Sequence, residues 1–155
     1  MSQDKQKSTE RDLSAPAKLA LKLGSGVHSG VYRATKGKLL GRMGKSPILL
    51  LNTVGRKTGQ KRTTPLLYAM DGENFVLIAS KGGAPTHPAW HLNLMANPDS
   101  TVEIGDRKLR VRAEEVGGEE KARLWQKMVE MYSSYDDYQK KTKRQIPLLV
   151  LHPRD

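Results

Sequence analysis

Basic residues are concentrated in one short segment of the sequence, GRKTGQKR at residues 55 to 62, with apolar runs on both sides. The apolar runs favour strands and Thr58-Gly59 favours a tight turn, so the segment is predicted to be the tip of a β-hairpin. Its cationic side chains are Arg56, Lys57, Lys61 and Arg62. Cations, a hydroxyl and exposed N–H groups bind anions, so the candidate partners are a phosphorylated ligand, a nucleic-acid backbone and an acidic membrane. The alternative is a solvated loop that protects sheet edges.

A second segment with anion-binding character is ASKGGAPTHPAWHLN, residues 79 to 93. We expect a strand to end at Ser80, a Lys-Gly-Gly turn to follow, and a helix to begin near Pro88. Successive N–H groups in a glycine turn form a concave anion site, and the start of a helix adds positive potential. Two such loops at strand ends favour a small ligand with a charged tail.

Tyrosines recur at every third position in MYSSYDDYQ, as Tyr132, Tyr135 and Tyr138. At that spacing on a helix or turn they share roughly one side. Phenols give an amphipathic wall that can hydrogen-bond a polar substrate, whereas a core stripe would normally use Leu or Val. In the alternative interpretation Tyr132 ends a buried helical stripe and the other two cap loops. The sequence leaves both interpretations open.

Other patterns in the sequence do not support a nucleotide-triphosphate site, a metal site or a serine nucleophile. LLGRMGKS, residues 39 to 46, lacks the first glycine of a nucleotide-triphosphate loop, and Pro47 begins a predicted strand where that loop needs a helix. His87 and His91 lie on a predicted helix at a spacing that suits a metal, but no third His or Cys is near and no HExxH pattern is present. We therefore predict no metal site. No serine lies in a recognisable nucleophile turn.

The elements that must position these segments are mostly β. Predicted strands cover residues 47–53, 64–70, 74–80, 101–104, 107–115 and 146–151, with tight turns at Asp71-Gly72 and Gly105-Asp106. Predicted helices cover residues 87–97 and 119–132. Antiparallel strands joined by hairpins, with two lateral helices, favour a small closed or half-open barrel.

Composition limits the class of protein. The 155 residues suit one domain, 37% of them are hydrophobic, and the absence of cysteine excludes disulfides and thiolate chemistry. No apolar run reaches about 18 residues, so no membrane span is predicted. The polar start does not resemble a secretory signal, and we expect a cytoplasmic protein.

Positive charge is unevenly distributed along the chain. The net charge is +11, and residues 1 to 45 hold ten Lys or Arg against three Asp or Glu. Residues 1 to 27 are predicted to form a polar tail and a short basic amphipathic helix, ahead of a domain at residues 28 to 155. This helix either packs on the domain or lies on a membrane surface or partner.

The sequence resembles the deazaflavin-dependent nitroreductase family of actinobacteria in three segments that occur in the same order. These are GRKTGQ, ASKGG with P.W.LNL.ANP, and MY.SY.DYQ with R.IP. The resemblance runs from about Tyr32 to Leu151. It implies a mainly β (α+β) fold, a split β-barrel of about six mostly antiparallel strands with flanking helices, similar to FMN-binding proteins. It also implies that coenzyme F420 binds, and that its reduced form F420H2 transfers a hydride to a small-molecule acceptor such as a quinone, enone or nitroaromatic.

The resemblance further implies roles for residues at matching positions. Contacts with the cofactor's phosphate and anionic tail are implied for Arg56, Lys57, Thr58 and Arg62. Lining of the ring and phosphate is implied for Thr64, Pro65, Ala79, Ser80, Lys81 and Gly82, completed by Trp90 and Asn93. A substrate wall, where a phenol orients or protonates the acceptor, is implied for Tyr132, Tyr135 and Tyr138. This chain departs from the family pattern at Leu67, which replaces a tyrosine, and at Lys61, which replaces a frequent proline.

Different classes of function remain possible at this point. The first is an F420H2-dependent reductase whose N-terminal helix makes peripheral contact with the inner membrane face, where menaquinone is an acceptor. The second is an FMN-dependent split-barrel oxidoreductase, and the third is a non-enzymatic basic module for RNA or acidic membrane. Nucleic acid is the disfavoured partner, because its binding needs stacking aromatics near the cations and the tyrosines are distant in sequence. No oligomeric state is predicted.

Overall fold

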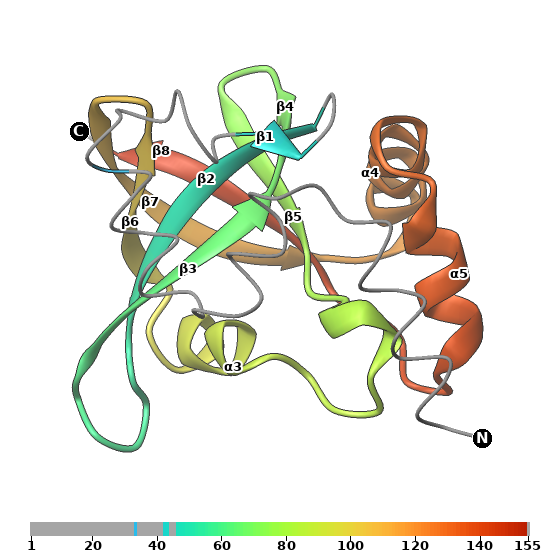
Figure 1. The fold of residues 1–155 in the computed structure, drawn as a ribbon, viewed down its shortest axis with the longest axis horizontal. Coiled ribbons are helices and arrows are strands. Elements are labelled where there is room, and N and C mark those ends of the chain that lie inside the picture. The colour runs from blue at the N-terminus through green and yellow to red at the C-terminus, as the bar shows by residue number, and fades with distance from the viewer. Residues whose placement is uncertain (1–32, 34–41, 44–45, 155) are drawn as a thin grey trace, which may run out of the picture.

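One antiparallel sheet forms the centre of the computed structural model, which describes Arg33, residues 42–43 and residues 46–154 (Figure 1). Its strands are β1 (Arg42–Met43), β2 (Ser46–Val54), β3 (Lys61–Leu67), β4 (Ala69–Asp71), β5 (Asn74–Ile78), β6 (Asp99–Ile104), β7 (Arg107–Val116) and β8 (Leu148–Arg154). The tail and helix predicted at residues 1 to 27 lie outside the described residues.

The order of the strands lets the sheet curl into a half-open barrel. Neighbouring strands run β1-β2-β6-β7-β8-β5-β4, and β3 pairs with β2 away from this path. Only Tyr68 separates β3 from β4, so two distant edges of the sheet are consecutive pieces of chain. The Tyr68 backbone N–H donates to the Pro47 carbonyl at 3.2 Å, which holds this bend against β2. The arrangement is the split barrel that the sequence predicts.

The strand boundaries differ from the prediction at several places. β3 begins at Lys61 rather than Thr64, β5 ends at Ile78 rather than Ser80, and β6 begins at Asp99 rather than Thr101. The strand expected at residues 64–70 is divided at Tyr68 into β3 and β4, because a sheet that closes on itself must bend where the chain passes from one edge to the other. The last strand begins at Leu148 rather than Ile146 and continues to Arg154. The predicted turns are present, and Gly72 and Gly105 adopt left-handed conformations with φ of +62° and +61°.

Both faces of the sheet are covered by helices. Side chains alternate between two clusters along strands β5 and β8. Leu77 and Leu149 belong to a core cluster with Leu94 of α3 (Ala89–Ala96), whereas Val76 and Val150 belong to a second cluster. The second cluster packs against α4 (Gly118–Met131) and α5 (Ser134–Lys141), which Figure 1 shows at one side of the barrel. Alternate residues are therefore buried on opposite faces, and this explains why ILLL and PLLVL are apolar throughout.

Two of the helices lie close to those predicted at residues 87–97 and 119–132, whereas the helical segments at residues 81–83 and 134–141 are additional. The helical segments are η1 (Lys81–Gly83), α3 (Ala89–Ala96), α4 (Gly118–Met131) and α5 (Ser134–Lys141). Pro88 precedes α3, and α3 ends at Ala96, just before Asn97-Pro98. The tyrosine segment forms its own helix, α5, with Tyr132 in the connection from α4. No helix in the described part of the chain is long and apolar enough to cross a membrane.

Candidate functional site

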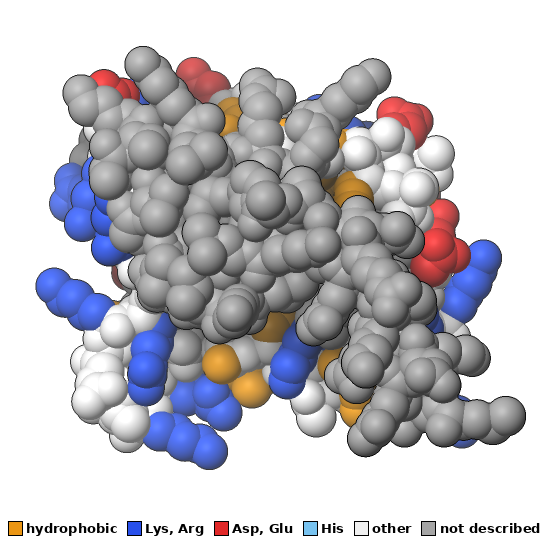
Figure 2. Space-filling view, viewed as in Figure 1, with side chains coloured by type: hydrophobic (Ala, Val, Ile, Leu, Met, Phe, Trp, Pro, Cys, Tyr) orange, Lys and Arg blue, Asp and Glu red, His pale blue; other side chains and the backbone are white. Residues whose placement is uncertain are grey.

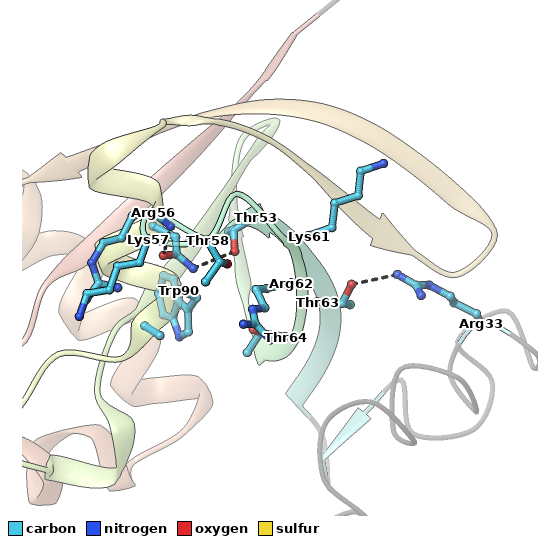
Figure 3. Close-up of a pocket in the computed structure, with 13 residues that line it drawn as sticks. Arg33, Thr53, Arg56, Lys57, Thr58, Lys61, Arg62, Thr63, Thr64 and Trp90 are labelled. Carbon is cyan, nitrogen blue, oxygen red and sulfur yellow. Dashed lines mark hydrogen bonds between the residues drawn. The ribbon is translucent and has the colours of Figure 1, made fainter.

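A cavity of about 660 Å³ lies between the β2–β3 hairpin and α3 (Figure 3). It is lined by Arg33, Thr53, Gly55, Arg56, Lys57, Thr58, Lys61, Arg62, Thr63, Thr64, Ala89, Trp90 and Asn93. These residues come from one hairpin, one helix and the N-terminal part of the chain. The cavity therefore brings together the basic segment and the start of the helix, which the sequence identifies separately as suited to anions.

The hairpin tip is a turn with its own backbone hydrogen bonds. The Gly55 N–H donates to the Gln60 carbonyl at 2.7 Å, and the Gly59 N–H donates to the Gly55 carbonyl at 2.8 Å. Gly59 has φ of +72°, a conformation that glycine adopts without strain. A Cβ atom at Gly55 would lie 2.9 Å from the Thr58 hydroxyl oxygen. Both glycines are therefore required by the shape of the turn that presents the cations.

The cations of this hairpin, Arg56, Lys57, Lys61 and Arg62, are exposed to solvent. Within the residues that the structure describes, none of them forms a salt bridge. Figure 2 shows Lys and Arg side chains around the projecting hairpin, at the lower left of that face. Among the described residues, the positive charge of the hairpin is therefore not balanced by contact with a carboxylate, which favours an anionic ligand.

Alternation along β3 divides the cavity residues between two sides of the strand. Arg62 and Thr64 lie on the side of Trp90, whereas Lys61 and Thr63 lie toward Arg33 (Figure 3). The Trp90 indole is buried and packs in the core cluster beneath the hairpin. The lining thus combines an aromatic floor and threonine hydroxyls with cations at the mouth, which fits a molecule that has a planar ring and an anionic tail.

Arg33 is a cavity residue that the sequence does not single out. Its guanidinium donates to both oxygens of Glu103, at 2.9 Å and 2.8 Å, and to the Asn52 and Thr63 side chains at 3.2 Å each. The hydrogen bond from Arg33 lowers the pKa of Glu103, and burial of that carboxyl opposes the shift. Since Glu103 lies on β6, 70 residues away in sequence, only the folded sheet reveals this contact.

The segment ASKGG forms a separate loop rather than part of this cavity lining. Ala79, Ser80, Lys81 and Gly82 are absent from the residues that line the cavity, and so is Pro65. Lys81 is a non-glycine residue with φ of +47°, and Gly82 and Gly83 follow at +64° and +83°. Three successive left-handed residues make a tight turn that other parts of the chain must hold in place.

The three tyrosines form one aromatic cluster. The Tyr132–Tyr135 ring centroids are 5.1 Å apart, the Tyr135–Tyr138 centroids are 6.3 Å apart, and the Tyr132 and Tyr138 hydroxyls share a hydrogen bond of 2.9 Å. Tyr135 is only 4% exposed and belongs to the core. Burial, followed by the hydrogen bond with Tyr132, raises the pKa of Tyr138 to about 12, and burial also raises the pKa of Tyr135. None of the three lines the cavity between the hairpin and α3.

His87 and His91 do not share a helix as predicted, because α3 begins at Ala89 and His87 lies in the loop before it. The His91 Nε2 atom lies 2.7 Å from a carboxylate oxygen of Glu115, and the His87 Nδ1 atom lies 3.0 Å from a nitrogen of Arg144. The described residues contain no group of His, Cys, Asp and Glu that could hold a metal ion.

A split barrel with a cationic, aromatic-floored cavity defines a protein that holds a phosphorylated ring cofactor. The family model described as F420H(2)-dependent quinone reductase matches residues 25–153, and the chain belongs to this family. It is thus an enzyme of the F420H2-dependent quinone reductase type, with F420H2 as the hydride donor. The sequence-based assignment to a deazaflavin-dependent reductase is confirmed at this level.

Relatives of known structure and function support the assignment. The chain is 44% identical over 132 residues to an F420H(2)-dependent quinone reductase of Mycobacterium tuberculosis, covering 83% of this chain and 89% of that protein. It is 42% identical to a solved F420-H2 dependent reductase (FDR-A), with a TM-score of 0.64, covering 68% of this chain and 94% of that one. The fold is also similar to that of a solved protein of the pyridoxamine 5'-phosphate oxidase type from Listeria innocua, with a TM-score of 0.51 at 15% identity. The match covers 70% of this chain and 84% of that one, and it shows a shared fold alone.

Proposed function

We propose that the protein reduces a quinone with a hydride from F420H2, and that the hairpin cavity holds the phosphate and anionic tail of this cofactor. The carrying observation is a cavity of about 660 Å³ surrounded by exposed hairpin cations that form no salt bridge with any residue the structure describes. Of the residues expected to bind the cofactor, the cavity lining includes Arg56, Lys57, Thr58, Arg62, Thr64, Trp90 and Asn93.

The proposed roles follow from the chemistry of the side chains. Arg56, Lys57 and Arg62 bind the anionic groups, since guanidinium and ammonium donors form charge-assisted hydrogen bonds with phosphate and carboxylate. Thr58 and Thr64 add hydroxyl donors, and Trp90 supports the apolar part of the cofactor. Lys61 lies on the other side of β3, toward Arg33, and extends the positive surface beyond the first contacts. The charge of Arg33 is itself paired with Glu103.

In the proposed reaction, bound F420H2 supplies the hydride. The protein's residues orient the donor and acceptor and keep water away, which accounts for much of the rate in such transfers. The quinone receives two electrons and one proton as the hydride, and needs one further proton to become a hydroquinone. We assign that proton to the hydroxyl of Tyr138, which shares a hydrogen bond with Tyr132, or to solvent.

Direct turnover tests this proposal. Purified protein is mixed with F420H2 and menadione, and the return of oxidised F420 absorbance is followed. We expect turnover with menadione and no stable complex with FMN. An absence of turnover with a panel of quinones and enones would contradict the proposal, and tight FMN loading with FMN-dependent turnover would favour the split-barrel flavin alternative.

The proposal also covers the range of acceptors and contact with a membrane. We extend the acceptors to enones and nitroaromatics, which also accept a hydride at an electron-poor atom. We also propose that the basic helix expected at residues 1 to 27 brings the enzyme to the inner membrane face, where menaquinone is dissolved. Deletion of residues 1 to 27 should lower binding to anionic liposomes. Unchanged partitioning of the truncated protein would contradict membrane contact while leaving the reaction with menadione intact.

A further inference from the structure

We propose that Arg144 is a positioning residue that fixes the loop of residues 79 to 87 against the tyrosine cluster, and thereby sets the relative position of cofactor and acceptor. The last part of this inference rests on the proposed function. Arg144 occupies the connection between α5 and β8, and its side chain reaches a loop about 60 residues earlier in the chain.

The Arg144 guanidinium donates hydrogen bonds to several acceptors of this loop at the same time. Its Nε donates to the Ala84 carbonyl at 2.8 Å, one terminal nitrogen donates to the Ala79 carbonyl at 3.2 Å, and the other donates to the Ser80 carbonyl at 2.7 Å. The nitrogen that binds Ala79 also lies 3.0 Å from the His87 Nδ1 atom. A planar fork of donors can satisfy this set of acceptors, whereas an ammonium group cannot reach all of them together.

This contact is needed because the loop has an unfavourable backbone. Ser80 precedes three consecutive left-handed residues, of which Lys81 is not glycine. Such a turn is retained when the surrounding structure determines it from several directions. Hydrogen bonds from one side chain to carbonyls on both sides of the turn provide that restraint. Arg144 therefore determines the positions of Ser80 and Lys81.

The backbone around Arg144 is tied in turn to the tyrosine helix. The Gln139 side chain on α5 donates to the Arg144 carbonyl at 2.8 Å and accepts from the Ile146 N–H at 3.0 Å. Gln139 directly follows Tyr138. Gln139 therefore holds the backbone of Arg144, and the side chain of Arg144 holds the loop. The loop and the tyrosine helix are joined through these two residues.

A close approach at Gly83 supplies a second, independent restraint. A Cβ atom at Gly83 would lie 2.7 Å from the Tyr138 carbonyl oxygen and 3.0 Å from the Lys141 side chain. The η1 turn therefore packs directly on the backbone of α5. Arg144 holds the outer part of the same loop, so the loop is clamped at two points against the helix that carries Tyr135 and Tyr138.

Arg144 also keeps its positive charge beside the loop. No carboxylate in the described residues forms a salt bridge with it, and its partners are three carbonyls and an imidazole nitrogen. Burial lowers the pKa of Arg144, yet an arginine remains protonated in proteins. The charge is thus available to reinforce the anion-binding character of the ASKGG loop.

His87 provides a spectroscopic reading of this contact that is independent of activity. Because Arg144 has only donors, His87 Nδ1 must accept, which requires a neutral ring with its proton on Nε2. Burial lowers the pKa of His87, and the neighbouring His91 and Arg144 lower it further. Removal of the guanidinium should therefore raise the pKa of His87 and mix its two neutral tautomers.

The experiment compares Arg144→Lys and Arg144→Ala with matched changes at Arg112, an exposed arginine of β7 that is paired with Asp99 of β6. We expect the Arg144 variants to lose about 100-fold in kcat/KM for menadione, the scale for a misplaced reacting group. Millimolar guanidinium should restore part of the activity of Arg144→Ala. The ¹⁵N spectrum of His87 should change in both Arg144 variants and in neither Arg112 variant.

The outcomes separate this inference from the proposed function. Wild-type kcat/KM and an unchanged His87 spectrum in folded Arg144→Lys would overturn the positioning role. A general loss of circular dichroism in Arg144→Ala without guanidinium rescue, together with wild-type behaviour of Arg144→Lys, would also overturn it. If the wild-type protein fails to oxidise F420H2, the proposed function is lost, and the His87 spectrum still decides whether Arg144 holds the loop.

Discussion

The side-chain carbonyl of Asn93 accepts a hydrogen bond from the backbone N–H of Arg56 at 3.1 Å. Asn93 is 5% exposed and lies on α3, whereas Arg56 begins the tip of the β2–β3 hairpin. The Asn93 amide nitrogen also donates to the Thr53 hydroxyl at 3.4 Å. One buried amide thus fixes the cationic tip over the start of the helix, and the cavity between them depends on this contact.

Asn93→Ala should therefore weaken both the fold and the binding of F420. The change removes the hydrogen bond to the part-buried N–H of Arg56, which contributes about 0.5 to 1.5 kcal/mol. We expect a lower melting temperature and about tenfold weaker F420 binding by fluorescence titration. Asn97→Ala is the matched control, because Asn97 is an exposed asparagine at the end of the same helix. Equal effects of the two changes would contradict a specific role for Asn93.

Removing charge from the hairpin tip tests the tail site. Arg56→Ala combined with Lys57→Ala should weaken F420 binding by about 100-fold, as expected when two charge-assisted contacts are lost, with little change in melting temperature. The control is Arg107→Ala combined with Lys108→Ala, an exposed basic pair beside the β6–β7 turn and outside this cavity. If both double variants bind F420 like the wild type, the hairpin is a solvated loop that protects the sheet edges.

The three tyrosines should differ in their effect on turnover. Tyr135 is buried, so Tyr135→Phe should leave kcat for menadione within about twofold while changing stability by less than about 1 kcal/mol. Tyr138→Phe removes the hydroxyl that pairs with Tyr132, and we expect kcat to fall by about 10- to 100-fold. A solvent isotope effect on kcat that persists unchanged in Tyr138→Phe would assign the second proton to solvent.

The Arg33–Glu103 pair predicts a change in stability with pH. Arg33 lowers the pKa of Glu103 below its ordinary value of 4.5, so the pair stabilises the fold above that value and the contribution is lost as the pH falls. Arg33→Ala should lower the free energy of unfolding at pH 7 by no more than about 1 kcal/mol, because Arg33 is partly solvated. Urea unfolding at pH 7 and pH 3 should show this difference shrinking in acid. A difference of equal size at both values would assign the effect to packing.

The sequence predicts much of this architecture because its signals are local. Apolar runs, glycine turns such as Asp71-Gly72, and Pro88 before α3 mark strands and helices over a few residues. The division of β3 from β4 at Tyr68 has no such signal, since the apolar character continues through the bend. It results from closure of the sheet, a property of strands that are distant in sequence.

The candidate site is predicted only in part, for the same reason. Charge density identifies the cations of the hairpin, and the family resemblance adds Trp90 and Asn93. Arg33 has no signal in the sequence, and Arg144 appears there only within the R.IP pattern of the family resemblance, without a role. The partners of these two arginines are 19 to 70 positions away. The loop at Ser80 and the tyrosine cluster are predicted by residue type, but their attachment to each other through Arg144 becomes visible only in three dimensions.

The hairpin projects from the barrel at the lower left of Figure 1, with its cations unpaired in the described structure. An approaching polyanion is attracted to such a charged arm before any contact forms, over a range of about 10 Å at 0.1 M salt. In the proposed function, the hairpin would therefore govern the speed of cofactor capture as well as its strength. Ionic strength would then change the rate at which oxidised F420 leaves this enzyme and F420H2 returns to it.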